Sequence, residues 1–255
     1  MFGSSSQPEI EFLPEDDARA WVADTLRSVV ARLGESAAAP RLFSRTKPPR
    51  DPDDLFELMC DAQAQVGHGD VDFGLVDLVE GAPEVPEGFA PLGNPAGQLM
   101  HTFRRNDEYV TVVAPSIFRK TELLLAGAAR ELGRISLAVA GGHQLEPQEY
   151  EAEAELAAIA LGMGVWVANG SYVFQNSCCG GGCGIDFRSL RTGLSMPEAC
   201  FATALDGHRK GLSRRSIAKH LESNQKAALK RSWGFVAKAP ELKALGSARV
   251  AGALA

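Results

Sequence analysis

Residues 123–140 read LLLAGAARELGRISLAVA, and this segment decides how the rest of the chain folds. At about 100° per residue, one broad apolar face is formed by Leu124, Leu125, Ala128, Leu132, Ile135 and Val139. The only charged residues around the whole circumference are Arg130, Glu131 and Arg134, on a stripe whose other members are apolar. A helix that is apolar nearly all round is typically buried, and buried charges need partners. The alternative is a helix with one solvent-exposed side, on which these three charged side chains are hydrated.

The core of this segment, Ala129-Arg-Glu-Leu-Gly-Arg-Ile, resembles the zinc-binding helix of the zincin metallopeptidases. That helix carries His-Glu-x-x-His, commonly as Ala-His-Glu-Leu-Gly-His-Ile, and here arginine stands at both histidine positions. In the intact motif two imidazoles at i and i+4 bind one zinc ion, and the glutamate activates a water molecule. Zincins of the gluzincin type take a third ligand from a carboxylate some twenty residues downstream, where this chain has Glu155.

The resemblance extends over residues 53–232, in the order of elements found in a group of uncharacterised bacterial zincin-like proteins. These have a short helix with a cysteine, a small sheet, the motif helix, a glycine-containing apolar helix and two C-terminal helices. The matching stretches here are Phe56-Glu-Leu-Met-Cys, Leu161-Gly-Met-Gly-Val and Arg191-Thr-Gly-Leu-Ser-Met. The resemblance therefore implies a zincin-like fold.

The two arginines change the chemistry that the resemblance implies. A guanidinium group stays protonated and offers no lone pair to a metal, so Arg130 and Arg134 would repel Zn²⁺. Without zinc, Glu131 has no metal-bound water to deprotonate. Arginine suits buried pairing with carboxylates, so we expect ion pairs with Glu155, Glu131 or Glu151. The sequence predicts a catalytically silent, metal- and cofactor-free protein with a binding, scaffolding or regulatory role and a protein partner.

A competing hypothesis is an active metal-dependent hydrolase that uses relocated ligands: His143, the cysteine loop and Glu155. The loop contains Cys178, Cys179 and Cys183, with Cys60 or Cys200 as a further thiol. Its Cys-Cys-x₃-Cys spacing departs from the C-x₂-C spacing of zinc and cluster sites. Reduced loop thiols, a metal site and a redox site all remain open. His143 lies in the loop between the two key helices, as a plain loop residue or a ligand; the other histidines have no partner spacing.

Periodicity predicts an α+β fold, mostly helical, with a small and largely antiparallel sheet. A flexible tail over 1–13, a single domain over 14–236 and an Ala-rich tail over 237–255 are expected. Helices are expected at 14–34, 51–67, 117–140, 147–168, 196–210 and 214–231, and strands at 71–79, 98–103 and 108–113. A hairpin turn is expected at Arg104-Arg-Asn-Asp, and close helix packing at Gly162 and Gly164.

Charge and hydropathy exclude further classes. The 26 Lys and Arg residues against 32 Asp and Glu give a net charge of −6, which argues against a dedicated nucleic-acid binder. A basic run from His208 to Arg231 is either solvated surface or a docking site for an acidic partner. The longest uncharged apolar run, 156–168, is shorter than the roughly 18 residues of a membrane span. With five cysteines and no readable secretory signal, a cytoplasmic protein is expected.

Overall fold

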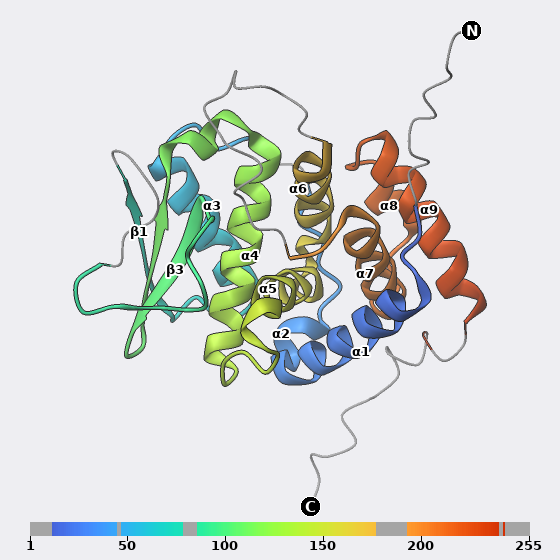
Figure 1. Ribbon diagram of the computed structural model, residues 1–255, viewed down its shortest axis with the longest axis horizontal. Coiled ribbons are helices and arrows are strands. Elements are labelled where there is room, and N and C mark those ends of the chain that lie inside the picture. Colours follow the sequence, from blue (N-terminus) through green and yellow to red (C-terminus); the bar gives the residue numbers. More distant parts are fainter. Residues whose placement is uncertain (1–11, 45–46, 79–85, 177–192, 240–241, 243–255) are drawn as a thin grey trace, which may run out of the picture.

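The computed structural model describes residues 12–44, 47–78, 86–176, 193–239 and 242, and it has an α+β fold that is mostly helical. A helical body makes up most of the molecule, and a small sheet lies at one end of it (Figure 1). No helix among the described residues is long and apolar enough to cross a bilayer. Phe12, Leu13 and Leu242, close to the two ends of the described chain, pack against the core.

The sheet has four strands in the order β1-β4-β3-β2. Their bounds are Asp72–Asp77 (β1), Ala90–Pro91 (β2), Met100–Arg105 (β3) and Glu108–Val113 (β4). The predicted hairpin is confirmed: β3 and β4 are antiparallel, and the turn residue Asn106 has φ 56°. β2 is also antiparallel to β3, but β1 runs parallel to β4, so the sheet is mixed. The two residues of β2 lie in a Pro/Gly-rich stretch and were not predicted.

The first half of the chain forms three longer helices close to where sequence signals place them, and a short one, Glu35–Ala38, where no helix was predicted. They are α1 (Asp16–Leu33), α2 (Glu35–Ala38), α3 (Pro52–Gln65), the 3₁₀ turn Pro115–Arg119 and α4 (Thr121–Val139). Asp51 caps α3 by accepting a hydrogen bond from the backbone N–H of Asp54 at 2.8 Å, and Pro52 occupies the first turn. The N–H groups of the first helical turn have no acceptor within the helix, so Pro52, which lacks an N–H, loses no hydrogen bond at this position. The capping aspartate and the proline therefore both favour a helix start here.

The single helix predicted over 147–168 is wrong. A 3₁₀ turn (Pro147–Glu149) leads into α5 (Tyr150–Ala158), a π-helical turn (Ile159–Met163) and α6 (Gly164–Asn176). Gly162 breaks the helix with φ 104°, a conformation that favours glycine, and a Cβ there would lie 2.7 Å from Arg41 O. The expected close packing is present, since a Cβ at Gly164 would meet Thr203 Oγ1 at 2.6 Å.

The C-terminal part contains three helices instead of the two predicted. They are α7 (Met196–Arg209), α8 (Arg214–Ala218) and α9 (Ser223–Lys238). α7 begins with a capping box in which Ser195 and Glu198 bind each other's backbone N–H groups. The helix expected over 214–231 is interrupted because Glu222 adopts an extended conformation (φ −80°, ψ 175°) before α9.

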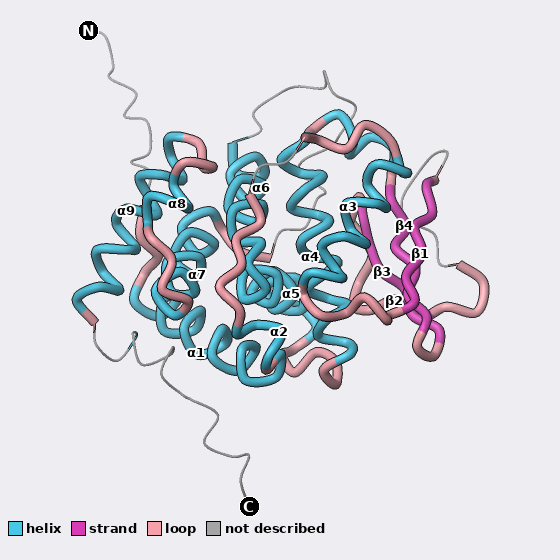
Figure 2. Tube along the Cα trace, turned by 180° about the vertical axis from the view of Figure 1, so that it is seen from behind, coloured by secondary structure: helices cyan, strands magenta, loops and turns pink. Residues whose placement is uncertain are grey.

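Helix α4 lies at the centre of the molecule, with the sheet and α3 on one side and most of the other helices on the opposite side (Figure 2). It packs against α5 and α6 on one side and against β3 on the other. The largest fully buried side chain is Trp166 of α6, whose Nε1 donates to Ser44 O at 3.0 Å. The core thus forms around α4, the segment whose sequence is apolar on almost every side.

The crossing of α4 and α5 depends on Gly133. A Cβ on Gly133 would lie 2.1 Å from Ala154 O and 2.8 Å from Ala158 N, both backbone atoms of α5. We expect Gly133→Ala to lower the free energy of unfolding by roughly 1–3 kcal/mol, because the two helices must separate. Urea denaturation of the two proteins measures this difference.

Gly127→Ala, in the same helix, is the matched control. Its Cβ would meet only the side-chain ends of Ile117 and Met100, at 3.4–3.6 Å. Alanine has the higher helix propensity by about 1 kcal/mol, so this variant should be as stable as the native protein or more so. Equal losses in both variants would contradict the close crossing at Gly133.

Candidate functional site

The three charged residues of α4 are buried, as the sequence predicted. Arg130 is 3 % exposed, and Glu131 and Arg134 are fully buried. The alternative of a solvated strip is therefore wrong. At the end of the helix Val139 is 46 % exposed, so the predicted apolar face loses its last member to the surface.

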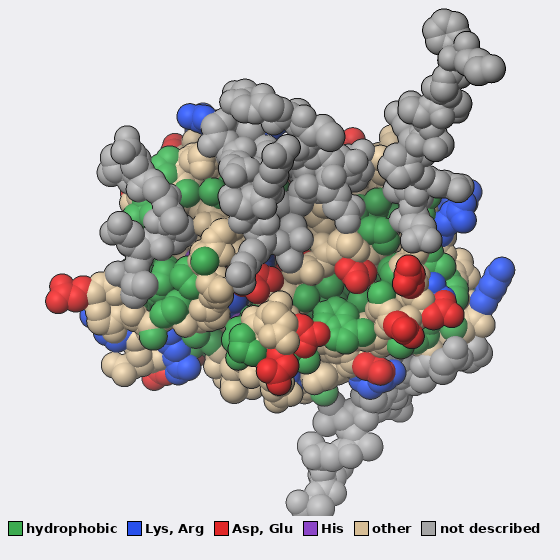
Figure 3. All heavy atoms as spheres, in the orientation of Figure 1, with side chains coloured by type: hydrophobic (Ala, Val, Ile, Leu, Met, Phe, Trp, Pro, Cys, Tyr) green, Lys and Arg blue, Asp and Glu red, His purple; other side chains and the backbone are tan. Residues whose placement is uncertain are grey.

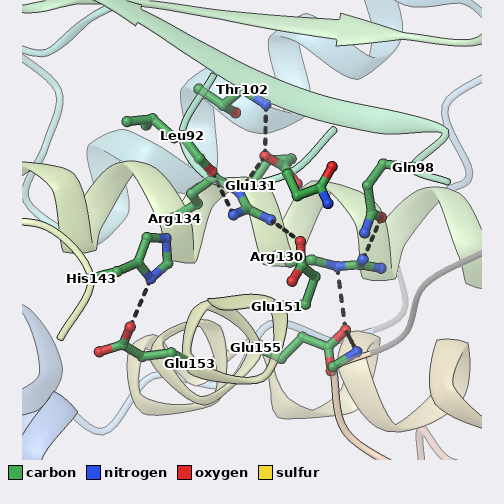
Figure 4. A network of polar contacts seen from close by, with 12 residues as sticks. Leu92, Gln98, Thr102, Arg130, Glu131, Arg134, His143, Glu151, Glu153 and Glu155 are labelled. Atoms are coloured by element: carbon green, nitrogen blue, oxygen red, sulfur yellow. Dashed lines mark hydrogen bonds and ion pairs between the residues drawn. The ribbon is translucent and has the colours of Figure 1, made fainter. Parts of the chain in front are cut away.

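Arg130 joins α4 to α5 and to the loop before β3. Its Nε lies 3.3 Å from Glu155 Oε1, and its Nη1 donates to Gln98 Oε1 at 2.7 Å (Figure 4). Glu155 also accepts hydrogen bonds from the backbone N–H groups of Gly193 (3.4 Å) and Leu194 (2.7 Å). Burial raises the pKa of Glu155 despite these contacts, and the nearby Glu151 adds to the rise. Glu155 is thus enclosed between α4 and the segment that begins α7.

Arg134 is bound on three sides. Its Nε donates to Glu131 Oε2 at 3.0 Å, its Nη1 donates to Leu92 O at 2.7 Å, and its Nη2 lies 3.8 Å from Glu151 Oε1. The ion pairs that the sequence predicted for Arg134 are therefore with Glu131 and Glu151, and its described contacts do not include Glu155. Gly93 sits so close to Arg134 that a Cβ there would lie 2.9 Å from Nη1.

Glu131 accepts a hydrogen bond from the sheet and another from within its own helix. Its Oε2 accepts from the backbone N–H of Thr102 in β3 at 2.9 Å, as well as from Arg134. Burial alone would raise the pKa of Glu131, but the guanidinium groups of Arg134 and Arg130 hold it below its usual value. Glu131 is therefore an ionised group that ties α4 to β3.

A third carboxylate of α5, Glu153, faces the opposite side of that helix. It forms an ion pair with Arg32 of α1 and a 2.7 Å contact between its Oε2 and His143 Nδ1. The ring of His143 stacks on Tyr150, with centroids 4.2 Å apart. Figure 4 shows His143 turned toward Glu153, whereas Glu155 points toward Arg130. The described residues therefore do not bring His143 and Glu155 together, as a relocated metal site would require.

Four residues of this network had no predicted role: Arg32, Gln98, His101 and Glu153. His101 is fully buried on β3, and neither of its ring nitrogens has a hydrogen-bond partner among the described residues. Its ring lies edge-on to Phe103, with centroids 5.4 Å apart. Burial lowers the pKa of His101 to about 4. The alternation of β3 places His101 and Phe103 on one face, and that signal could have identified a buried histidine.

The cysteines of the predicted thiol cluster, Cys178, Cys179 and Cys183, lie outside the described residues. The two thiols considered as further ligands are visible. Cys200 is fully buried in α7, and burial raises its pKa to about 12. Cys60 is half-buried, and its pKa is also raised by burial. Both thiols thus favour the protonated form, which binds metals poorly.

The donor set around α4 does not fit a zinc ion. A guanidinium group occupies each position where the zincin resemblance places an imidazole, and each is already bound to carboxylate oxygens. Within the described ranges no group of three His, Cys, Asp or Glu side chains is arranged to hold a metal ion. What the arrangement does is neutralise buried carboxylates and fix the neighbouring loops.

Removing Arg134 should destabilise the protein strongly. Arg134→Met leaves Glu131 and Glu151 buried without their shared cation, and breaking a buried ion pair costs about 3–5 kcal/mol. The double variant Arg134→Met/Glu131→Gln should recover part of that loss, because one uncompensated charge is gone. Chemical denaturation of the single and double variants provides the comparison.

Arg27→Met serves as the control, because Arg27 forms an exposed pair with Asp24. Exposed pairs contribute at most about 1 kcal/mol. A loss for Arg134→Met as small as that for Arg27→Met would be inconsistent with a buried network.

His101 should make stability depend on pH. The folded pKa of about 4 lies below the ordinary value of 6.5, so the unfolded chain alone takes up this proton between these values. The contribution of His101 to the free energy of unfolding is then fully present above pH 6.5. It decreases by about 1.4 kcal/mol per pH unit as the pH falls toward 4. His101→Leu should reduce this slope between pH 6.5 and pH 5. The slope that remains comes from His68 and His220, whose pKa values burial also lowers. Urea denaturation at several pH values tests it, and parallel pH profiles for the two proteins would show that His101 does not carry the effect.

A comparison with known proteins found no matching family model, no matching curated protein and no matching solved structure.

Proposed function

We propose that this protein is a catalytically silent, metallopeptidase-like protein that acts by binding. One observation carries the proposal: Arg130 and Arg134, at the two positions of the zincin histidines, are buried and ion-paired with glutamates of α4 and α5. Permanently protonated groups at these positions repel a divalent cation and offer it no lone pair.

The state of Glu131 supports the same conclusion. A general base must reach the proton that it removes, yet one oxygen of Glu131 accepts from both Thr102 and Arg134 in the protein interior. Its lowered pKa makes it a weak base. Glu131 therefore acts as a structural acceptor.

The segment from Leu92 to Gln98 supports it further. Arg134 binds the first residue of this segment and Arg130 binds the last. The segment is thereby held over the charged stripe of α4, where a hydrolase would need room for substrate and water. The two arginines that exclude a metal ion thus also hold the segment from Leu92 to Gln98 in place.

We further propose a protein partner and a place in the cytoplasm, with a scaffolding or regulatory role. The odd number of cysteines supports this location, and Cys60 and Cys200 are free thiols. An active hydrolase with relocated ligands is less well supported, because His143 is engaged by Glu153.

Restoring the two histidines should create a zinc site. In Arg130→His/Arg134→His, two imidazoles at i and i+4 face Glu151 and Glu155, and either carboxylate completes the three protein ligands of a catalytic zinc centre. We expect about one zinc per chain, measured by elemental analysis of protein purified without a polyhistidine tag. The native protein should carry none at this helix. Binding should weaken as the pH falls through the histidine range, because the ligands must be deprotonated.

Two further variants identify the third ligand and report on folding. Adding Glu155→Gln or Glu151→Gln to the double variant should abolish zinc binding in one case only. Zinc should also raise the melting temperature of the double variant, since a ligand that binds only the folded state stabilises it. Stoichiometric zinc at this helix in the native protein would contradict the proposed function. A folded double variant that binds no zinc would contradict the proposed geometry.

A further inference from the structure

The helices α8 and α9 lie at the end of the molecule opposite the sheet (Figure 1) and concentrate its positive charge. Residues 211–238 contain seven Lys and Arg residues and a single acid, Glu222, for a net charge of +6. Since the net charge of the whole chain is −6, the residues outside 211–238 have a net charge of −12. Figure 3 shows acidic side chains over α1 and basic ones at the edge where α8 and α9 lie. The acidic net charge therefore does not describe this end of the protein.

We call six exposed side chains here the basic surface: Arg214, Arg215, Lys219, Lys226, Lys230 and Arg231. Among the described residues, none of the six forms an ion pair.

Three exposed arginines elsewhere in the described part of the chain are each paired with a nearby acid. Arg27 pairs with Asp24, Arg50 with Asp54 and Arg105 with Glu108. Unpaired like charges repel one another, so a surface that concentrates them is typical of a binding site for a polyanion.

Helix α9 presents these cations in two rows. Its buried side is formed by Gln225, Ala228, Leu229, Ser232 and Val236. At 100° per residue, the opposite side has Lys226 and Lys230 along one margin and Arg231 and Lys238 along the other. Between the two rows lie only the small residues Ser223, Ala227 and Gly234. The space above Gly234 is open, since a Cβ there would meet no atom within 4 Å.

We propose that α8 and α9 bind double-stranded DNA through its backbone phosphates, with the exposed side of α9 in the major groove. A helix with its side chains is about 10–12 Å wide, and the major groove of B-DNA is about 12 Å wide. The small residues let the helix enter the groove, and each row of cations then faces one phosphate backbone. The deep, narrow groove of an RNA duplex does not admit a helix.

The composition of the basic surface favours DNA over a protein or a membrane. Protein interfaces have apolar and aromatic residues at their centre, and membrane-surface helices insert Trp, Phe or Leu side chains. The exposed large hydrophobic residues of the described chain are Phe56, Val76 and Val139, none of them on α8 or α9. Recognition here rests on charge and shape, so binding should be independent of base sequence. This inference does not depend on the proposed function.

The test is fluorescence anisotropy of a labelled DNA duplex of about 25 base pairs with the full-length protein, from about 50 to about 200 mM salt. The logarithm of the affinity should fall linearly with the logarithm of the salt concentration. The triple variant Lys226→Ala/Lys230→Ala/Arg231→Ala should lower the affinity by about 100-fold or more near 100 mM salt, and reduce the slope by about three.

Arg27→Ala/Arg50→Ala/Arg105→Ala removes the same net charge elsewhere on the surface and should leave binding within a fewfold of native. Both triple variants should melt near the native temperature, because all the changes are at exposed positions. Polyglutamate, anionic lipid vesicles and an RNA duplex are the competitors. Absence of DNA binding at low salt, equal losses in the two triple variants, or a competitor bound as tightly as DNA would overturn the proposal.

Discussion

The pairing of arginines with the glutamates of α5 is the interaction on which the rest of the structure depends. Residues 151–158 of α5 are buried on every side, and three of them are glutamates. A buried carboxylate without a partner is very costly, so this helix can occupy the core only if guanidinium groups reach it. Arg32 of α1 reaches Glu153, and Arg130 and Arg134 of α4 reach Glu155 and Glu151. These pairs therefore specify how α1, α4 and α5 lie against one another.

The same side chains also hold the loops that surround the core. Arg134 and Arg130 bind the two ends of the segment from Leu92 to Gln98. Glu155 accepts from the backbone N–H groups that precede α7, and Arg32 binds Gly142 O in the loop after α4. Such contacts exchange apolar packing for directional bonds, which select one arrangement of the loops over others. This demand on the arginines is why we favour a structural role for the charged stripe of α4.

Local sequence patterns predicted the parts of the fold that depend on near neighbours. The apolar circumference of α4 indicated burial of Arg130, and the hairpin of β3 and β4 followed from alternation and its turn. The parallel pairing of β1 with β4 was not predicted, because periodicity does not say which strands lie side by side. The single helix over 147–168 failed at Gly162, which has a positive φ and leaves no room for a Cβ beside Arg41, a residue far away in sequence. The pairing of Glu153 with Arg32 was missed for the same reason, although three glutamates in an otherwise apolar helix already indicated three cationic partners.

Helix α7 connects the charged core with the basic end of the molecule. Its first turn follows directly after Leu194, whose N–H group binds Glu155. Near its other end a Cβ on Gly207 would lie 2.8 Å from the ring of Trp233 in α9, so these helices are in close contact. Helix α7 therefore contacts, at its two ends, the segment bound by Glu155 and the helix that carries Trp233. The helix that presents most of the basic surface thus packs on the same helix whose first residues follow the backbone bound by Glu155.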